Sequence, residues 1–107
     1  MTAALNITQP LTLQGYTLKN RLIKGAMSEA LSNVPGKVTP ELLKLYDTGA
    51  QGGLGCSITG NVMIDLRAKN EPGVVVVEDE SDLVGLSQWA ALGKRYDMPQ
   101  IVRWWHP

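Results

Sequence analysis

The residues of this 107-residue chain that could recognise a ligand stand at the ends of two short apolar runs. Ser28 follows Ala26 and Met27 after one run, and Asn61 follows Gly60 after the other. A hydroxyl donates and accepts hydrogen bonds, and an amide carries a separate donor and acceptor, so both side chains suit the polar edge of a ligand. The alternatives are ordinary strand packing, with Ser28 opening a loop, and a simple Gly-Asn turn. The residue types alone favour the structural alternative for the first group.

The single cysteine and the single histidine do not predict catalysis. Cys56 lies in a run of small and apolar residues, which favours a buried thiol over a metal ligand, and a lone cysteine cannot form an internal disulfide. His106 follows the last apolar run and is interpreted as the end of a strand. We therefore expect no catalytic residue, no metal ligand and a reducing compartment, the cytoplasm. The charged residues near the first strand are expected to form ion pairs; they are Arg21, Lys24 and Glu29.

Composition and charge exclude several classes of partner. The chain has 10 Lys and Arg residues and 10 Asp and Glu residues, so it lacks the positive field that binds nucleic acid or an acidic membrane. The Arg-Trp-Trp-His stretch at 103–106 lacks the basic groove that a stacking platform for nucleic acid needs. No apolar run approaches the roughly 20 residues that span a bilayer, and the first ten residues do not resemble a signal peptide. We expect neither nucleic acid nor a membrane as partner.

Hydrophobic patterning predicts alternating strands and helices. Leucines at 11, 13 and 18 around a Gln-Gly pair indicate a hairpin. The predicted elements are a hairpin over about 11–19, strands over about 21–27, 55–61 and 100–105, and helices over about 40–51 and 81–95. Strand–helix units in this order give parallel strands joined by right-handed crossovers. The predicted fold class is therefore α/β.

Both helices have recognisable start signals. Thr39 can cap free backbone N–H groups, Pro40 suits the first helical position, and Glu41 favours the positive end of the helix dipole. The acidic cluster at 78–82 is predicted to occupy the first turn of the second helix. The four valines at 74–77 are too few to predict a strand.

Three stretches of the chain resemble one known family. Residues 9–31 read QPLTLQGYTLKNRLIKGAMSEAL, residues 36–65 read GKVTPELLKLYDTGAQGGLGCSITGNVMID, and residues 71–95 read EPGVVVVEDESDLVGLSQWAALGKR. In order and spacing, particularly in LKNR and GG-G-ITGN, they resemble the start of the old yellow enzyme family of FMN-dependent ene-reductases and NADH:flavin oxidoreductases. The resemblance implies the N-terminal part of a (β/α)8 TIM barrel with a preceding β-hairpin, residues 1–107 forming one incomplete barrel. A full barrel takes about 250 residues.

The same resemblance implies a cofactor and its contacts. FMN would lie at the C-terminal ends of the strands and carry hydride from NADH or NADPH to an activated, enone-type alkene. Ala26, Met27 and Ser28 would lie against the flavin, giving apolar surface to its face and hydrogen-bond donors to its edge. Gly60 and Asn61 would lie beside its pyrimidine part, where glycine allows close approach.

The third predicted strand departs from the family. Family members have Gln where this chain has Arg103, and smaller residues where it has Trp104 and Trp105, whereas the following His-Pro is shared. Arginine cannot accept a hydrogen bond from the flavin N3–H as an amide does, and its charge needs a partner. We therefore do not expect Arg103 to bind the cofactor.

These observations lead to two functional hypotheses. In the first, the chain is an N-terminal fragment of an FMN-dependent NAD(P)H oxidoreductase or ene-reductase and is inactive alone, because the family's substrate-binding and proton-donating residues come from later strands. In the second, it is a non-catalytic binding or assembly module that completes its sheet with another chain or forms a homo-oligomer through exposed strand edges.

Overall fold

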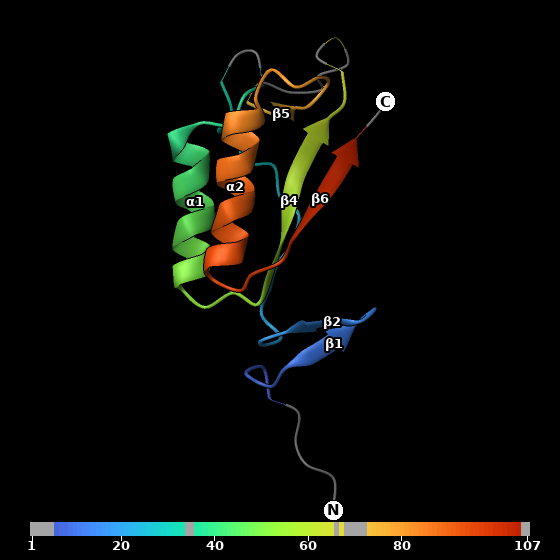
Figure 1. Ribbon diagram of the computed structural model, residues 1–107, viewed down its shortest axis with the longest axis vertical. Helices are drawn as coiled ribbons and strands as arrows, with labels where there is room; N and C mark the ends of the chain where they lie inside the picture. Colours follow the sequence, from blue (N-terminus) through green and yellow to red (C-terminus); the bar gives the residue numbers. More distant parts are fainter. Residues whose placement is uncertain (1–5, 34–35, 66, 68–72, 106–107) are drawn as a thin grey trace, which may run out of the picture.

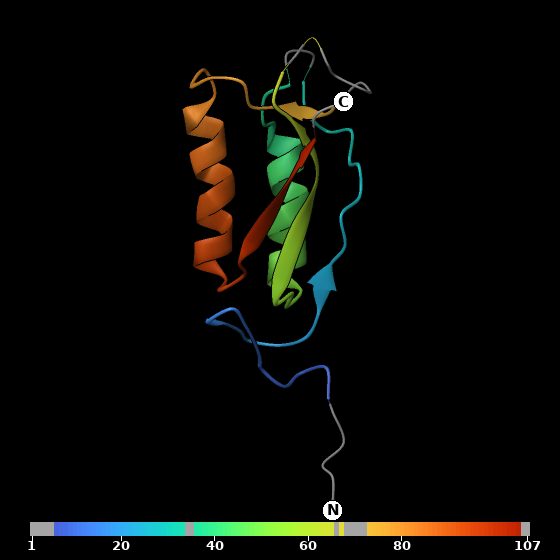
Figure 2. The ribbon, with the colours of Figure 1, turned by 90° about the vertical axis from the view of Figure 1, so that its right-hand side faces the viewer.

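The computed structural model describes residues 6–33, 36–65, 67 and 73–105. A two-stranded N-terminal hairpin precedes a four-stranded sheet, and two helices accompany the sheet. Figure 1 shows both helices on one side of the sheet, and Figure 2 looks onto the other side, which no helix covers. Among the described residues, no helix has the length and apolarity needed to cross a membrane. His106 and Pro107 lie outside the described residues.

The elements alternate as the α/β prediction requires. In chain order they are β1 (Leu11–Leu13), β2 (Tyr16–Leu18), β3 (Ile23–Lys24), α1 (Pro40–Gln51), β4 (Cys56–Met63), β5 (Val75–Val76), α2 (Leu83–Arg95) and β6 (Gln100–Trp105). The hairpin strands are antiparallel, and every pairing within the larger sheet is parallel. The strands do not close into a barrel within the part of the chain that the structure describes.

Strand β4 holds the sheet together. Val62 of β4 pairs with Val75 of β5 and also with Trp104 of β6, so these two strands lie on opposite edges of β4. Ser57 pairs likewise with both Lys24 and Gln100, which places β3 on the same edge as β5. Every strand of the larger sheet therefore depends on β4 for its ladder hydrogen bonds.

The first sheet strand is shorter than predicted. The sequence predicts a strand over about 21–27, whereas β3 comprises Ile23–Lys24 alone. Beyond β3, two side chains take the positions on β4 that backbone groups would otherwise fill. Lys24 Nζ donates to the Ile58 carbonyl at 3.1 Å, and the Glu29 carboxylate accepts from the Gly60 N–H at 3.3 Å. Side-chain hydrogen bonds thus replace the backbone ladder beside this part of β4.

The two helices begin differently. In α1, Thr39 Oγ1 accepts from the Leu42 N–H at 3.2 Å and Pro40 occupies the first turn, which confirms the predicted cap. The predicted placement of the acidic cluster is wrong, because the cluster precedes α2 and the first turn of α2 contains no acidic residue. Asp82 at the start of α2 instead accepts from the Val38 N–H at 2.8 Å. Its carboxylate joins α2 to the segment that leads into α1.

The core lies between the two helices and β4. Tyr46 of α1 and Trp89 of α2 contact edge to face, with ring centroids 5.1 Å apart. Both rings are buried in one cluster with Leu42, Val62 and Leu92. Burying aromatic and aliphatic side chains in this way is the main favourable term in folding.

The Glu29 carboxylate links the sheet to this core. Its Oε1 accepts from the Tyr46 hydroxyl and lies 3.2 Å from Lys24 Nζ, which confirms the ion pair expected for Lys24 and Glu29. Arg21 forms no ion pair with the described residues; its guanidinium donates to the Pro10 carbonyl at 3.2 Å. Lys24 Nζ also lies 5.0 Å from the centre of the Tyr46 ring. Burial, with the hydrogen bond to Glu29 and its negative charge, raises the pKa of Tyr46 far above its ordinary value.

Removal of the Tyr46 hydroxyl tests this link. Tyr46→Phe is expected to lower the free energy of unfolding by about 1–3 kcal/mol, because a partly buried carboxylate loses a donor. Urea unfolding followed by circular dichroism measures the change. Tyr96→Phe is the matched control, since its hydroxyl receives only a 3.3 Å bond from the exposed Gln51 side chain. Equal effects of the two substitutions would show that Glu29 gains nothing from Tyr46.

The raised pKa of Tyr46 predicts that the difference in stability between the unsubstituted chain and Tyr46→Phe depends on pH. Above pH 10.0, the ordinary pKa of tyrosine, the unfolded chain releases the Tyr46 proton while the folded chain keeps it. The unfolded state then binds fewer protons, so the free energy of unfolding falls as the pH rises. Relative to Tyr46→Phe, the unsubstituted chain should lose about 1.4 kcal/mol per pH unit above this point. A difference that stays constant from pH 8 to 11 would contradict this.

Candidate functional site

A β-bulge near the end of β4 shapes the candidate site. Ile58 pairs with Ile101 of β6, but the next pair is Asn61 with Arg103, so β4 contains one residue more than β6 over this interval. The Thr59 hydroxyl stabilises the irregularity. It accepts from the Arg103 N–H at 3.0 Å and donates to the Gly60 carbonyl at 2.9 Å.

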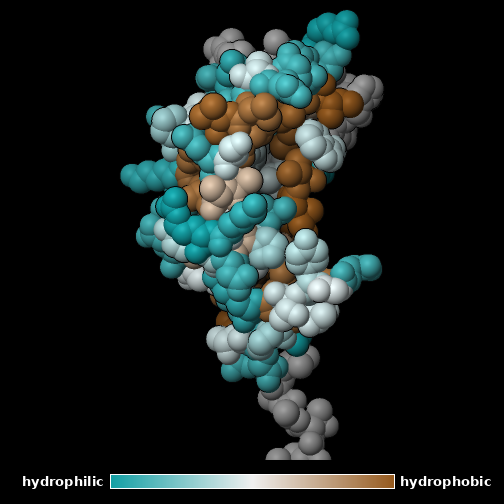
Figure 3. Space-filling view, viewed as in Figure 1, coloured by the Kyte–Doolittle hydropathy of each residue, from teal (hydrophilic) through white to brown (hydrophobic). Residues whose placement is uncertain are grey.

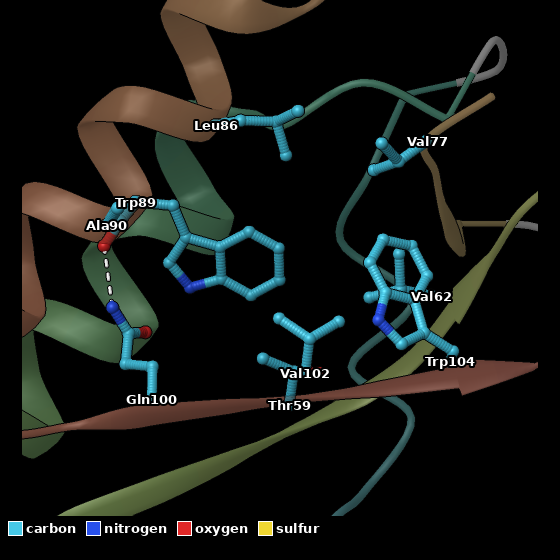
Figure 4. A pocket seen from close by; sticks show the side chains of 9 residues that line it. All are labelled: Thr59, Val62, Val77, Leu86, Trp89, Ala90, Gln100, Val102 and Trp104. Carbon is cyan, nitrogen blue, oxygen red and sulfur yellow. Dashed lines mark hydrogen bonds between the residues drawn. The ribbon is translucent and has the colours of Figure 1, made fainter. Parts of the chain in front are cut away.

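The bulge sets which side chains face away from the helices. Val62 lies in the core below the helices, and Trp104 lines a hollow with Trp89 of α2 (Figure 4). Because neighbouring residues of a strand point to opposite faces, Asn61 and Arg103 lie on the face that the helices leave open. Their side chains are neighbours on that face, at the carboxyl-terminal half of the parallel strands.

The segment after β3 lies along the other edge of β4. A Cβ atom built on Gly60 would stand 2.3 Å from the Met27 carbonyl oxygen, so the two backbones are in contact. The Met27 side chain is 70% exposed. Ala26 is half-buried and Ser28 is exposed beside it. The structure thus brings the first predicted group of residues next to the second.

Glycine at position 60 has a structural reason of its own. The added Cβ would also stand 2.4 Å from a carboxylate oxygen of Glu29. Glycine at position 60 therefore lets the segment that carries Met27 and Glu29 pack against β4. Any side chain at this position would displace that segment.

Asn61 offers an unused hydrogen-bond acceptor. Its Oδ1 is buried and has no hydrogen-bond partner among the described residues, whereas buried polar atoms of proteins are usually paired. The residue as a whole is only half-buried, and the terminal torsion of an asparagine turns readily. With the exposed Met27 nearby, this part of the sheet offers apolar surface and an acceptor, which fits a flat ring with an N–H on its edge. These residues therefore fit the flavin that the family resemblance implies.

The described residues offer little else for catalysis. No group of three or more His, Cys, Asp and Glu residues in the part that the structure describes could hold a metal ion. Cys56 is buried with 2% of its surface exposed, which confirms its predicted place in the core, and burial raises the pKa of its thiol.

Two residues with a positioning role are not evident in the sequence. Glu29 carries no motif, and only its partners on α1 and β4 reveal that it joins them. Thr59 reads as an ordinary strand residue, although a hydroxyl directly before glycine is compatible with a bulge. A buried hydroxyl within a predicted strand is the one signal that could have indicated it.

Comparisons with known proteins agree with the resemblance in sequence. No protein-family model matches the chain. It is 34% identical over 110 residues to the NADH-dependent flavin oxidoreductase iliE of Hypocrea jecorina, covering 98% of this chain and 27% of that protein. The NADH-dependent flavin oxidoreductase iccE of Talaromyces variabilis is 32% identical over the same shares of the two chains. The chain therefore spans about a quarter of the length of these relatives.

Solved structures agree on the fold. Old Yellow Enzyme from Pichia sp. AKU4542 matches 94% of this chain with a TM-score of 0.84 and 15% identity, over 26% of its own length. A 2-naphthoyl-CoA reductase in complex with 2-naphthoyl-CoA matches 94% with a TM-score of 0.88 and 22% identity, over 16% of its own length. In sequence, the chain matches a portion of NADH-dependent flavin oxidoreductases, and in fold it matches a portion of Old Yellow Enzyme.

Proposed function

We propose that the chain is the N-terminal part of an FMN-dependent NAD(P)H oxidoreductase acting on activated alkenes, and that it is inactive alone. The observation that carries the proposal is the match of 98% of the chain to 27% of a flavin oxidoreductase. When bound, FMN would take hydride from NADH or NADPH and deliver it to the alkene. The free, buried thiol of Cys56 suits the cytoplasm, where such a protein would meet these nucleotides.

The chain's own residues would bind and orient the ring. Ala26 and the exposed Met27 would cover part of its face, and Ser28 would donate to its edge. Asn61 Oδ1, which lacks a partner among the described residues, would accept from the ring N3–H beside Gly60. None of these groups transfers a proton to substrate, which is why the isolated chain would lack activity.

A second candidate function is assembly with another chain. Beside β6 and α2 lies an apolar hollow of about 270 Å³ (Figure 4), and Figure 3 shows hydrophobic side chains around it. Trp104 on β6 is 56% exposed and Ile101 is 54% exposed. The edge of β6 opposite β4 has no strand partner among the described residues. A strand and helix from another molecule would complete this side of the sheet.

The isolated chain is expected to bind FMN weakly, in the millimolar range, and to oxidise no NADH. It presents one part of the ring site without the later strands of a barrel. Titration with FMN should shift the amide resonances of Met27, Ser28 and Asn61 in ¹H–¹⁵N NMR spectra. The full-length Hypocrea jecorina relative serves as the positive control for NADH oxidation. Purification of this chain with stoichiometric flavin and NADH oxidation would contradict its proposed inactivity.

The assembly function predicts concentration-dependent self-association through β6. Trp104→Glu should weaken dimer formation at least tenfold, because it places a charge on the apolar edge. Sedimentation velocity over a range of protein concentrations measures this. Val84→Glu is the matched control, since Val84 is 74% exposed on α2 and does not line the hollow. A monomer at all concentrations would exclude the homo-oligomer.

A further inference from the structure

We propose that the hollow between α2 and β6 binds a small alcohol, a neutral molecule with one hydroxyl group on an apolar body of about one ring. The inference does not depend on the flavin-binding function. The hollow lies on the face of the sheet that the helices cover, whereas the proposed flavin contacts lie on the open face and along the other edge of β4. It also gives a role to Trp104, which those contacts leave unused.

The walls of the hollow are apolar. Its volume is about 270 Å³, and Figure 4 shows the indoles of Trp89 and Trp104 on opposite sides of it. Aliphatic side chains from β4, β6, α2 and the segment after β5 complete the walls; they include Val62, Val77, Leu86 and Val102. Flat apolar rings pack well against indoles, and an apolar cavity of roughly 150 Å³ is enough to hold benzene. The hollow therefore has the space and the surface for a body of one ring.

Two buried polar atoms of residues that line the hollow have no partner. Trp89 is 7% exposed, and its Nε1 has no acceptor among the described residues. Gln100 Oε1 is also buried and has no donor among them. Figure 4 shows the indole nitrogen on the side of the ring that faces the Gln100 amide. Because buried donors and acceptors are usually paired, this donor and this acceptor indicate a polar group of a ligand between apolar walls.

The Gln100 amide is held in one orientation. Its Nε2 donates to the Trp89 carbonyl at 2.7 Å, which identifies the nitrogen and leaves Oε1 as the unused group. A Cβ atom built on Gly93 would stand 2.9 Å from this Nε2, so the glycine lets the amide reach the backbone of α2. Ser57 lies opposite Gln100 on β4, but its hydroxyl forms no hydrogen bond with the described residues. The acceptor is thus fixed beside the indole and stays available.

A hydroxyl group matches this donor and acceptor. Its oxygen can accept from the Trp89 Nε1–H while its own proton is donated to Gln100 Oε1, so one atom satisfies both groups. An ether oxygen only accepts, and it would leave the glutamine acceptor unpaired. A charged group would lose its hydration without an opposite charge, because no charged side chain is among the described residues that line the hollow. The chemistry of the site therefore selects a neutral alcohol.

The test is an NMR titration of the full 107-residue chain with three probes of similar shape. Benzyl alcohol donates and accepts, benzyl methyl ether only accepts, and toluene does neither. The protein concentration is kept where sedimentation shows a monomer, because the proposed assembly would cover the same hollow. Trp89→Phe identifies the indole N–H resonance of Trp89. The three probes test the inference on the unsubstituted chain, even where a variant fails to fold.

Three further variants test the site itself. Val102→Phe fills the hollow with a larger side chain, and Gln100→Met removes the acceptor while keeping a similar length. Val84→Phe is the matched control, because Val84 is 74% exposed on α2 and does not line the hollow. Circular dichroism of each variant confirms that it is folded before its titration is interpreted.

The inference predicts a specific pattern of dissociation constants. Benzyl alcohol should bind saturably with a Kd on the order of 1 mM and move the Trp89 indole N–H resonance downfield, as a new hydrogen bond does. Benzyl methyl ether and toluene should bind about tenfold more weakly, since Gln100 Oε1 stays unpaired. Gln100→Met should bind the alcohol and the ether equally. Val102→Phe should abolish binding, and Val84→Phe should leave it unchanged.

Three results would overturn the inference. Equal affinities of the unsubstituted chain for benzyl alcohol and benzyl methyl ether would show that the donor and the acceptor select nothing. Binding that persists unchanged in Val102→Phe would place the alcohol elsewhere. Absence of a saturable shift of the Trp89 indole resonance would show that water alone satisfies the two groups. None of these results bears on the flavin contacts, which are tested by the FMN titration described above.

Discussion

The Glu29 carboxylate is the interaction on which the arrangement of this chain depends. It accepts hydrogen bonds from α1 through Tyr46 and from β4 through the Gly60 N–H, and it pairs with Lys24 of β3. A carboxylate is taken from water at a cost that only several donors together offset. Because its donors belong to three different elements, this cost is met only when all three are in place. The segment that carries Met27 is thereby held beside β4.

The site follows from two departures from regular β structure. The early end of β3 leaves room for side chains to bond to β4, and the bulge at Thr59 turns Asn61 toward the open face opposite Arg103. A regular ladder in both places would give a more uniform sheet. It would also place glycine, instead of an amide, beside the guanidinium.

The sequence contains enough information for the α/β class, the cap of α1 and the burial of Cys56, because these depend on local patterns and on residue type. It does not reveal the short β3 or the bulge, since both depend on hydrogen bonds between segments far apart in the chain. The prediction that the acidic cluster at 78–82 occupies the first turn of α2 is wrong for the same reason. Dipole arguments favour acidic side chains in a first turn, whereas Asp82 bonds to Val38 in another segment.

The central place of β4 has a kinetic consequence. None of its pairings is a tight hairpin: α1 lies between β3 and β4, residues 64–74 separate β4 from β5, and β5 and α2 lie between β4 and β6. Each such pairing costs loop-closure entropy before its contacts contribute any favourable free energy. Folds with many pairings of this kind therefore fold slowly. The hairpin of β1 and β2 needs no such closure and can form early. During synthesis, β4 leaves the ribosome before β5 and β6, and in that interval the whole β6 edge of this apolar strand and the end of its other edge, where β5 later pairs, are available to chaperones.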